Sequence, residues 1–410
     1  MRQNPVSTAN LQLVKETNLA LIFDLIFHCS PISRAELTAR THLSPTTVSS
    51  LVDELRQKNV VAETGAVRTG TSGRKPIMLA IQGSGAGMIA LELFSDGFKC
   101  CLYNLLCEKI GERSVTAVDF HGLGGELADL SAELLREHGF QDRLLGISLA
   151  VPGLIDQEQE RVISSTVVPI DSGFDLLRDL KMAFPGVPVI LENESSLCAY
   201  AEKAFGRGKE VRNLVYLDIN RGIGGGIILE NRLYRGSWGI SGEAGHISID
   251  CGGPQCRCGN YGCLEVMAGI PAVRQLASEA ISQGRTTLLR DMTAGDLTHL
   301  TFYILGQALD QGDETARDIT VTIARRLACG ANSIANLFNP DLIVIGGEIC
   351  CLGNRLFDPL NEYLTRIALK TGRHHLTVTS AAIKKDAALL GGARYVLDTV
   401  FKRPAVFGSF

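Results

Sequence analysis

The segment 241–265 constrains the fold most, because it places one histidine ten residues before a C-x-C-x4-C motif. Three thiolates and one imidazole are the usual ligands of a tetrahedral structural zinc site, and glycines between cysteines allow a short loop to surround one ion. The sequence therefore predicts a closed zinc site that orders a loop and orients two flanking carboxylates, Glu243 and Glu265. The predicted ligands are His246, Cys256, Cys258 and Cys263.

A chain of 410 residues is too long for one ordinary core, so we expect two or three domains. Its twelve cysteines include the adjacent pairs Cys100-Cys101 and Cys350-Cys351 within apolar runs, and no apolar signal segment opens the sequence. These features indicate a reduced cytoplasmic protein with buried thiols rather than a disulfide framework. No apolar run approaches the roughly 20 residues of a membrane helix, so no membrane partner is expected.

Residues 1–81 read as a winged helix-turn-helix. Apolar residues recur at helical spacing over 17–28, Ser33 and Glu36 form a capping box, and Ser44-Pro45 opens a third helix. Two β-prone segments follow at 60–63 and 77–81. Residues 1–80 carry nine Lys/Arg against six Asp/Glu, a charge of +3, which leaves −7 for the rest of a chain of net charge −4. A DNA-binding head on an acidic body is the expected arrangement, and a small helical packing domain is the alternative.

The predicted DNA contacts are short polar groups at the start of the third helix and basic residues of the wing. A recognition helix meets base edges and phosphates with its N-terminal residues, and a basic glycine-hinged wing suits a minor groove. The predicted double-stranded DNA contacts are Arg34, Ser44, Thr46, Thr47, Ser49, Ser50, Arg74 and Lys75.

The remaining chain predicts a bilobal α/β body with a cleft. After a linker at 82–87, strands and helices alternate, and we expect a first lobe over 82–200 completed by a helix at about 387–410. The second lobe would cover 201–386 and carry the zinc loop. Its glycine-rich segment 221–226 is predicted as a turn, either purely structural or the remnant of a phosphate-binding loop.

Several short motifs together resemble the ROK family (repressors, open reading frames, kinases). They are E-x-G-H at 243–246, C-x-C-G-x2-G-C-x-E at 256–265, Pro-Gly at 152–153, Asn-Glu at 193–194, and N-L-F-N-P at 336–340 followed by Gly-Gly at 346–347. The winged helix matches the repressor branch, and within that branch the chain looks more like xylose-operon repressors than the N-acetylglucosamine repressor.

The resemblance implies an actin/hexokinase-like fold in which structural zinc orders a sugar-binding loop. Carried over by position, the zinc ligands would be the four residues above, with Cys251 as a possible competing ligand. His246 would face both the metal and the sugar. The alternative for the Asn-Glu pair is a cap at the end of a strand without ligand contact. The implied sugar-binding residues are Gly153, Asn193, Glu194, Glu243, His246 and Glu265.

The family contains kinases and repressors, and three departures favour a regulator. Bulky residues fill the first phosphate turn at 92–96, Asn220-Arg221 replaces a Gly-Thr, and Glu194 stands where family kinases have an aspartate base. We therefore expect no enzyme activity, but a sugar-responsive repressor that binds its operator as a homodimer or homotetramer. The effector would be a sugar or a sugar phosphate. A sugar kinase with an appended DNA-binding domain and a body that binds a partner protein, such as a transport component, are the alternatives.

Overall fold

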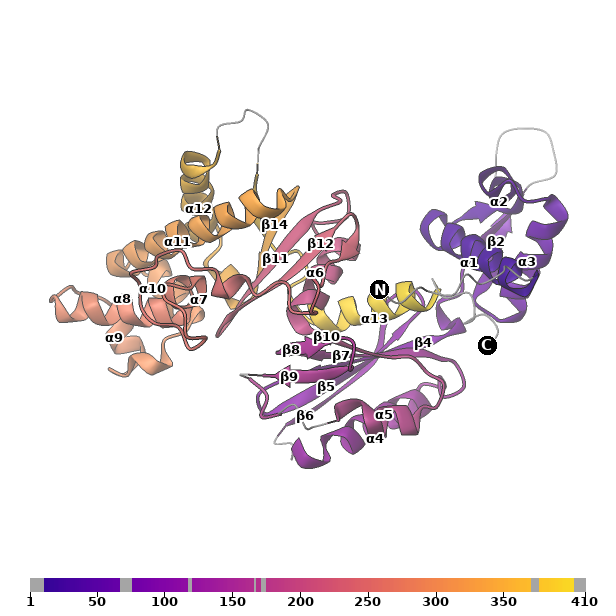
Figure 1. Ribbon diagram of the computed structural model, residues 1–410, viewed down its shortest axis with the longest axis horizontal. Helices are drawn as coiled ribbons and strands as arrows, with labels where there is room; N and C mark the ends of the chain where they lie inside the picture. Colours follow the sequence, from indigo (N-terminus) through magenta and orange to yellow (C-terminus); the bar gives the residue numbers. More distant parts are fainter. Residues whose placement is uncertain are drawn as a thin grey trace. The chain divides into compact units, whose positions relative to one another are not determined.

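The computed structural model describes residues 11–66, 76–116, 120–165, 167–170, 175–369 and 376–401. The chain forms two compact units (Figure 1). Unit 1 comprises Met1–Val151, Thr166–Leu191 and Gly392–Phe410, and unit 2 comprises Pro152–Ser165 and Glu192–Gly391. The helix that follows Asn193 therefore belongs to unit 2, whereas the division predicted from the sequence put it in the first lobe. The division into domains 1–81, 82–200 and 201–386 stays a prediction, because the two compact units do not show which parts of the chain fold independently. None of the described helices is long and apolar enough to cross a membrane.

The N-terminal head has the predicted order of three helices and two strands, with one short strand, β1, that the sequence did not predict. Its helices are α1 (Leu11–Cys29), α2 (Arg34–Thr41) and α3 (Pro45–Gln57), and its strands are β1 (Ile32–Ser33), β2 (Val61–Ala66) and β3 (Ile77–Ile81). The capping box at Ser33 and the N-cap at Ser44 are both formed. Helix α3 is fixed because its apolar stripe is buried; the stripe consists of Val48, Leu51, Val52 and Leu55. The wing residues Arg74 and Lys75 lie outside the described part of the chain.

The rest of unit 1 is built on a five-stranded sheet in the order β10-β7-β4-β5-β6. Strands β4 to β6 form an antiparallel meander, and β7 pairs parallel with β4. The elements are β4 (Gly87–Leu93), β5 (Gly97–Asn104), β6 (Lys109–Thr116), α4 (Leu123–Glu137), β7 (Leu144–Val151), α5 (Leu176–Ala183), β10 (Val189–Asn193) and the final helix α13 (Ala387–Phe401). The predicted linker at 82–87 is not a free tether, since the amide of Gln82 donates to the carbonyl of Val60 and the amide of Leu105 to that of Gly83.

Unit 2 carries a second five-stranded sheet in the order β13-β12-β11-β14-β15, followed by a helical layer. Strands β11 and β14 are parallel and β12 is antiparallel to β11. The strands are β8 (Leu154–Asp156), β9 (Arg161–Ser164), β11 (Leu214–Ile219), β12 (Ile223–Leu229), β13 (Arg232–Leu233), β14 (Leu342–Gly346) and β15 (Val378–Ser380). The helices are α6 (Glu194–Phe205), α7 (Leu264–Ala268), α8 (Ile270–Ser282), α9 (Leu289–Met292), α10 (Phe302–Asp310), α11 (Glu314–Phe338) and α12 (Asn354–Ile367). The inner face of α11 is buried in the core of this unit.

The glycine-rich segment at 221–226 differs from its prediction, because β12 begins at Ile223 and its glycines are strand residues. Helix α6 lies so close to this strand that a Cβ on Gly226 would come within 2.6 Å of the Cβ of Ala199 and of the carbonyl oxygen of Ser195. Close packing between a helix and a strand explains the glycines without a phosphate ligand. The structure thus favours the structural alternative.

We predict that Gly226→Ala lowers the free energy of unfolding by about 1–3 kcal/mol, because the new methyl group forces α6 away from β12. Gly125→Ala is the matched control: this position in α4 has open space around the added Cβ, and alanine should be neutral or stabilise by up to about 1 kcal/mol. Thermal unfolding of both variants measures the difference. Equal melting temperatures for the two variants would contradict the packing argument.

Candidate metal and ligand site

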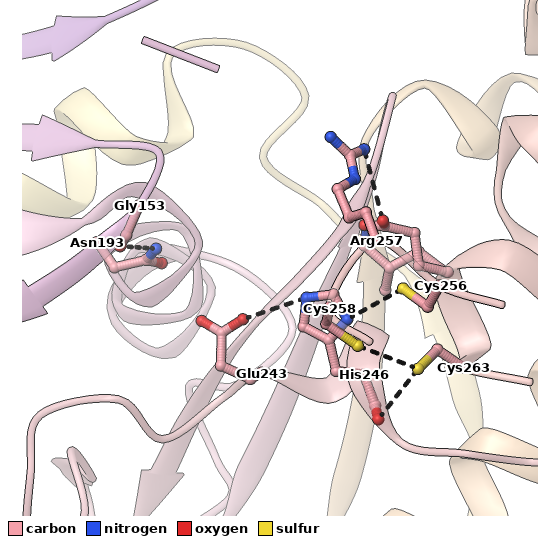
Figure 2. A network of polar contacts seen from close by, with 10 residues as sticks. Gly153, Asn193, Glu243, His246, Cys256, Arg257, Cys258 and Cys263 are labelled. Carbon is pink, nitrogen blue, oxygen red and sulfur yellow. Dashed lines mark hydrogen bonds and ion pairs between the residues drawn. The ribbon is translucent and has the colours of Figure 1, made fainter. Parts of the chain in front are cut away.

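The four predicted zinc ligands lie together in unit 2. His246 ends the short 3-10 helix Ala244–His246, and Cys263 immediately precedes α7. The ligand atoms of the set lie within 4.8 Å of one another, and Figure 2 shows the imidazole and the thiols pointing toward one another. The set consists of His246, Cys256, Cys258 and Cys263.

The distances within this cluster match a tetrahedral zinc site. In a tetrahedral site, a Zn–S bond of about 2.3 Å and a Zn–N bond of about 2.0 Å place two sulfurs about 3.8 Å apart and a sulfur and a nitrogen about 3.5 Å apart. The Sγ atoms of Cys258 and Cys263 are 3.6 Å apart, and Sγ of Cys256 is 3.7 Å from Nδ1 of His246. A disulfide would need about 2.0 Å between sulfurs. The cluster can therefore hold a metal ion.

Hydrogen bonds between backbone groups hold the metal loop, residues 246–263, in its conformation. The amide of Cys256 donates to the carbonyl of Asn260 at 2.7 Å, and the amide of Gly259 returns to the carbonyl of Cys256 at 2.9 Å. Gly262 has φ +60, and a Cβ there would lie 1.7 Å from the carbonyl oxygen of Asp250, so only glycine fits. Cys251, which the sequence left open as a competing ligand, is exposed and does not belong to the cluster.

His246 faces two groups at once. Its Nδ1 lies toward Cys256, and its Nε2 lies 3.9 Å from an Oε2 of Glu243 (Figure 2). Desolvation raises the pKa of Glu243, and burial raises the pKa of the Cys263 thiol to about 12. The ring geometry suits an imidazole that binds metal with one nitrogen and orients a carboxylate with the other.

The second flanking carboxylate, Glu265, is buried and already has partners. Its Oε2 accepts a hydrogen bond from the amide of Ile223 at 3.0 Å, and its Oε1 lies 3.6 Å from Nη2 of Arg257. Glu265 thus fixes the first residue of β12 to the metal loop. Only the remaining lone pairs of the carboxylate can accept a hydrogen bond from a ligand hydroxyl.

Asn193 caps helix α6 and also forms a hydrogen bond with the backbone of Gly153. Its Oδ1 accepts from the amide of Ser196 at 3.1 Å, and its Nδ2 donates to the carbonyl of Gly153 at 3.1 Å (Figure 2). Asn193 is therefore the N-cap of α6, and its carboxamide keeps one N–H and one lone pair for a ligand. Glu194 is the first residue of α6. All the predicted sugar residues lie in unit 2.

The sequence did not single out the ion pair that supports these residues. Glu192 is buried, with its side chain 3% exposed, and its Oε2 accepts from Nη2 and Nε of Arg235 at 2.6 and 2.7 Å. Its Oε1 accepts from the amide of Asn193 at 3.0 Å and lies 3.4 Å from Nε2 of Gln157. Desolvation raises the pKa of Glu192, and the Arg235 charge opposes that shift. No spacing in the sequence links Glu192 to Arg235 or Gln157, because these residues meet only in the folded structure.

The ends of β11 and β14 hold a polar network that includes Asn220, one of the two residues that stand where family kinases have Gly-Thr. Nδ2 of Asn220 donates to Oδ2 of Asp218 at 2.9 Å, and Oδ1 of Asn220 accepts from the amide of Glu348 at 2.8 Å. Burial raises the pKa of Asp218 to about 6. The amide of Glu348 is therefore already bonded to a side chain rather than directed at a ligand.

The first phosphate turn, in unit 1, connects β4 to β5. Leu93 is fully buried, Phe94 is 39% exposed, and the amide of Phe94 donates to the carbonyl of Gly97 at 2.7 Å. Of the bulky residues noted in the sequence, Phe94 stands in this turn and Leu93 is buried at the end of β4, and the amide of Phe94 closes the hairpin.

The predicted DNA residues at the start of α3 are bonded to one another. Oγ of Ser44 accepts from the amide of Thr47 at 3.1 Å and lies 2.8 Å from the hydroxyls of Thr46 and Thr47. Thr46 and Ser50 are exposed, and Thr47 and Ser49 are half-buried. Arg34 pairs with Asp53 at 2.8 Å and with Glu63 at 2.9 Å, so intramolecular carboxylates already balance its charge.

Comparison with known proteins gives consistent matches. A model of the ROK family matches residues 89–399. A putative xylose repressor from Caldicellulosiruptor sp. (strain Rt8B.4) is 30% identical over 406 residues, covering 96% of this chain and 99% of the relative. A solved ROK family transcriptional regulator, described as a homologue of the E. coli MLC protein, covers 96% of this chain and 98% of its own at 27% identity with a TM-score of 0.82. A ROK hexokinase from Thermus thermophilus covers 77% of this chain and 100% of its own at 26% identity and a TM-score of 0.65.

We predict that Cys258→Ser lowers the zinc content of the purified protein from about one ion per chain to well below half, because a four-ligand structural site loses a thiolate. Cys251→Ser, an exposed cysteine of the same loop outside the cluster, should keep the full metal content. Elemental analysis after gel filtration measures both. Full zinc in Cys258→Ser would contradict the ligand assignment.

Proposed function

We propose, from the premise that this chain belongs to the ROK family, that it is a sugar-responsive transcriptional repressor of carbohydrate-utilisation genes. One observation carries the proposal: the described head is a winged helix joined to a ROK body. The similarity to a solved ROK regulator extends over nearly the whole chain, whereas the ROK hexokinase covers only 77% of it. The relative named a putative xylose repressor also aligns from end to end.

The effector site would be the carboxylate-rich end of the zinc loop. Structural zinc would be held by His246 and the three cysteines, and four protein ligands would leave it no open coordination position. Zinc would supply no reaction step and would fix the imidazole that faces Glu243. Sugar hydroxyls would form hydrogen bonds with the carboxylates and with the remaining N–H and lone pair of the Asn193 carboxamide. These hydroxyl-binding groups are Asn193, Glu194, Glu243, His246 and Glu265, with the Gly153 backbone beside them.

We infer that phosphoryl transfer is not the activity of this protein. Catalysis of that reaction relies on backbone amides and small residues that approach the phosphates. Here the side chain of Asn220 holds the amide of Glu348, and bulky residues form the first turn. Glu194 is one methylene longer than an aspartate base, and a displacement of about 1 Å can cost about 100-fold in rate.

The sugar would act on DNA binding through a difference in affinity. An operator dyad is read by two heads whose half-sites lie about one helical turn or a multiple apart, so a homodimer or homotetramer is the expected state. A sugar shifts operator affinity only if it binds the DNA-free and DNA-bound states with different affinities, and release from the operator requires tighter binding to the DNA-free state. A repressor of this kind would act in the cytoplasm.

We predict that the purified protein binds a sugar without consuming ATP. Calorimetry with D-xylose, D-glucose and N-acetylglucosamine should show binding of at least one of them, while a coupled ADP assay with the same sugars stays at background. Glu194→Gln should leave any residual ADP signal unchanged, since that signal would come from a contaminant. Sugar-dependent ADP release that Glu194→Gln abolishes would establish the kinase alternative instead.

A second prediction concerns the DNA contacts of α3. Thr46→Ala, at the exposed N-terminal end of the helix, should weaken binding to a duplex selected from a random library by about 1–3 kcal/mol. Gln57→Ala, an exposed residue at the other end of α3 beyond the acidic residues Asp53 and Glu54, is the control and should bind normally. Fluorescence anisotropy at fixed salt measures both affinities. Equal loss in both variants would contradict the assigned orientation of the helix.

A further inference from the structure

Trp238 is the single tryptophan of the chain, and it is 81% exposed. No other large hydrophobic residue in the described part of the protein is as exposed. A lone exposed apolar side chain has no meaning by itself, but an indole left in water beside polar groups is a common feature of ligand-binding surfaces. Its surroundings therefore decide whether Trp238 has a role.

The loop that carries Trp238 is held by specific contacts. The hydroxyl of Ser241 donates to the carbonyl of Tyr234 at 2.6 Å, and the amide of Ser241 donates to the carbonyl of Arg235 at 3.2 Å. Gly239 has φ +77, and a Cβ there would lie 2.9 Å from the carbonyl oxygen of Ile155 in β8. The loop is thus closed at its base and packed against the strand that follows Gly153.

Both ends of this loop are joined to proposed sugar-binding residues. At one end, Arg235 is paired with Glu192, which also accepts from the amide of Asn193. At the other end, the chain runs through Gly242 into Glu243, the carboxylate that faces His246. Trp238 therefore belongs to a short loop, and both ends of this loop are joined to residues that position the proposed hydroxyl-binding groups.

We propose that Trp238 is a selectivity-determining residue whose indole covers the C–H face of an uncharged monosaccharide. This inference rests on the proposed function. Carboxylates and a carboxamide hold hydroxyls at the edge of a sugar ring, which leaves the apolar C–H face to be covered by an aromatic ring. A pyranose with equatorial hydroxyls presents such a face.

The charges of the site favour an uncharged sugar over a sugar phosphate. Glu194, Glu243 and Glu265 contribute negative charge, the charge of Arg235 is balanced by Glu192, and Arg257 is itself paired with Glu265. A phosphate group near these carboxylates would be repelled. Stacking on Trp238 requires only a C–H face, so neutral aldoses are the expected class.

The first test uses the intrinsic fluorescence of the full-length zinc-loaded protein. Excitation at the red edge of the absorption band reports Trp238 alone, because the chain has no other tryptophan. Titration with D-xylose or D-glucose should change the emission saturably, with the same Kd as calorimetry. Glucose 6-phosphate should bind about tenfold more weakly or not at all.

The second test compares three variants by calorimetry with the sugar that binds best. Trp238→Ala should weaken binding about tenfold, and Trp238→Phe, which keeps an aromatic face, should recover most of the affinity. Tyr303→Ala removes another exposed aromatic of unit 2, 56% exposed on α10, and should bind like the wild type. Since Trp238 is exposed, its variants should keep the wild-type melting temperature.

The outcomes separate this inference from the proposed function. Calorimetric sugar binding with no change in tryptophan emission and unchanged affinity in Trp238→Ala would overturn the role of Trp238 and leave the repressor proposal standing. The same result is expected if the indole serves a protein partner. Preferred binding of the sugar phosphate would overturn the charge argument. Absence of binding by every sugar would overturn both proposals.

Discussion

The buried ion pair between Arg235 and Glu192 is the interaction on which the arrangement of the candidate site depends. The carboxylate is almost completely removed from solvent, and loss of Arg235 would leave it as an uncompensated buried charge, at a cost of about 3–5 kcal/mol. Glu192 also contacts Gln157, which follows β8, and the amide of Asn193, which precedes α6. One carboxylate therefore joins β10, the β8 segment and the loop that leads to Glu243.

The metal cluster forms a second anchor on the other side of Glu243. His246 faces Cys256 with one ring nitrogen and Glu243 with the other, and Glu265 ties the metal loop to the first residue of β12. In Figure 2, Glu243 stands between the Asn193–Gly153 contact and the cysteines. A structural ion bound by these ligands would thus act through position alone, by fixing the imidazole that faces Glu243.

The sequence predicted the local features of the protein well. Capping residues placed the starts of α2 and α3, and the spacing of His246 and the three cysteines indicated the cluster that the structure brings together. The family resemblance and the winged-helix fold are confirmed. The features that the sequence did not predict depend on contacts between segments that are distant in the chain. Residues 223–226 belong to strand β12, on which α6 packs closely, and the partners of Glu192 come from segments far apart in sequence, with no periodicity to reveal them.

The central claim is that sugar binding in unit 2 controls operator binding by the head. The direct measurement is the Kd for a selected operator duplex at fixed salt, by fluorescence anisotropy, with and without a saturating neutral sugar that calorimetry shows to bind. A coupling free energy of the usual size, about 1–3 kcal/mol, predicts that the sugar raises the operator Kd by about 5- to 150-fold. An operator Kd that stays the same with the sugar fully bound would contradict the claim.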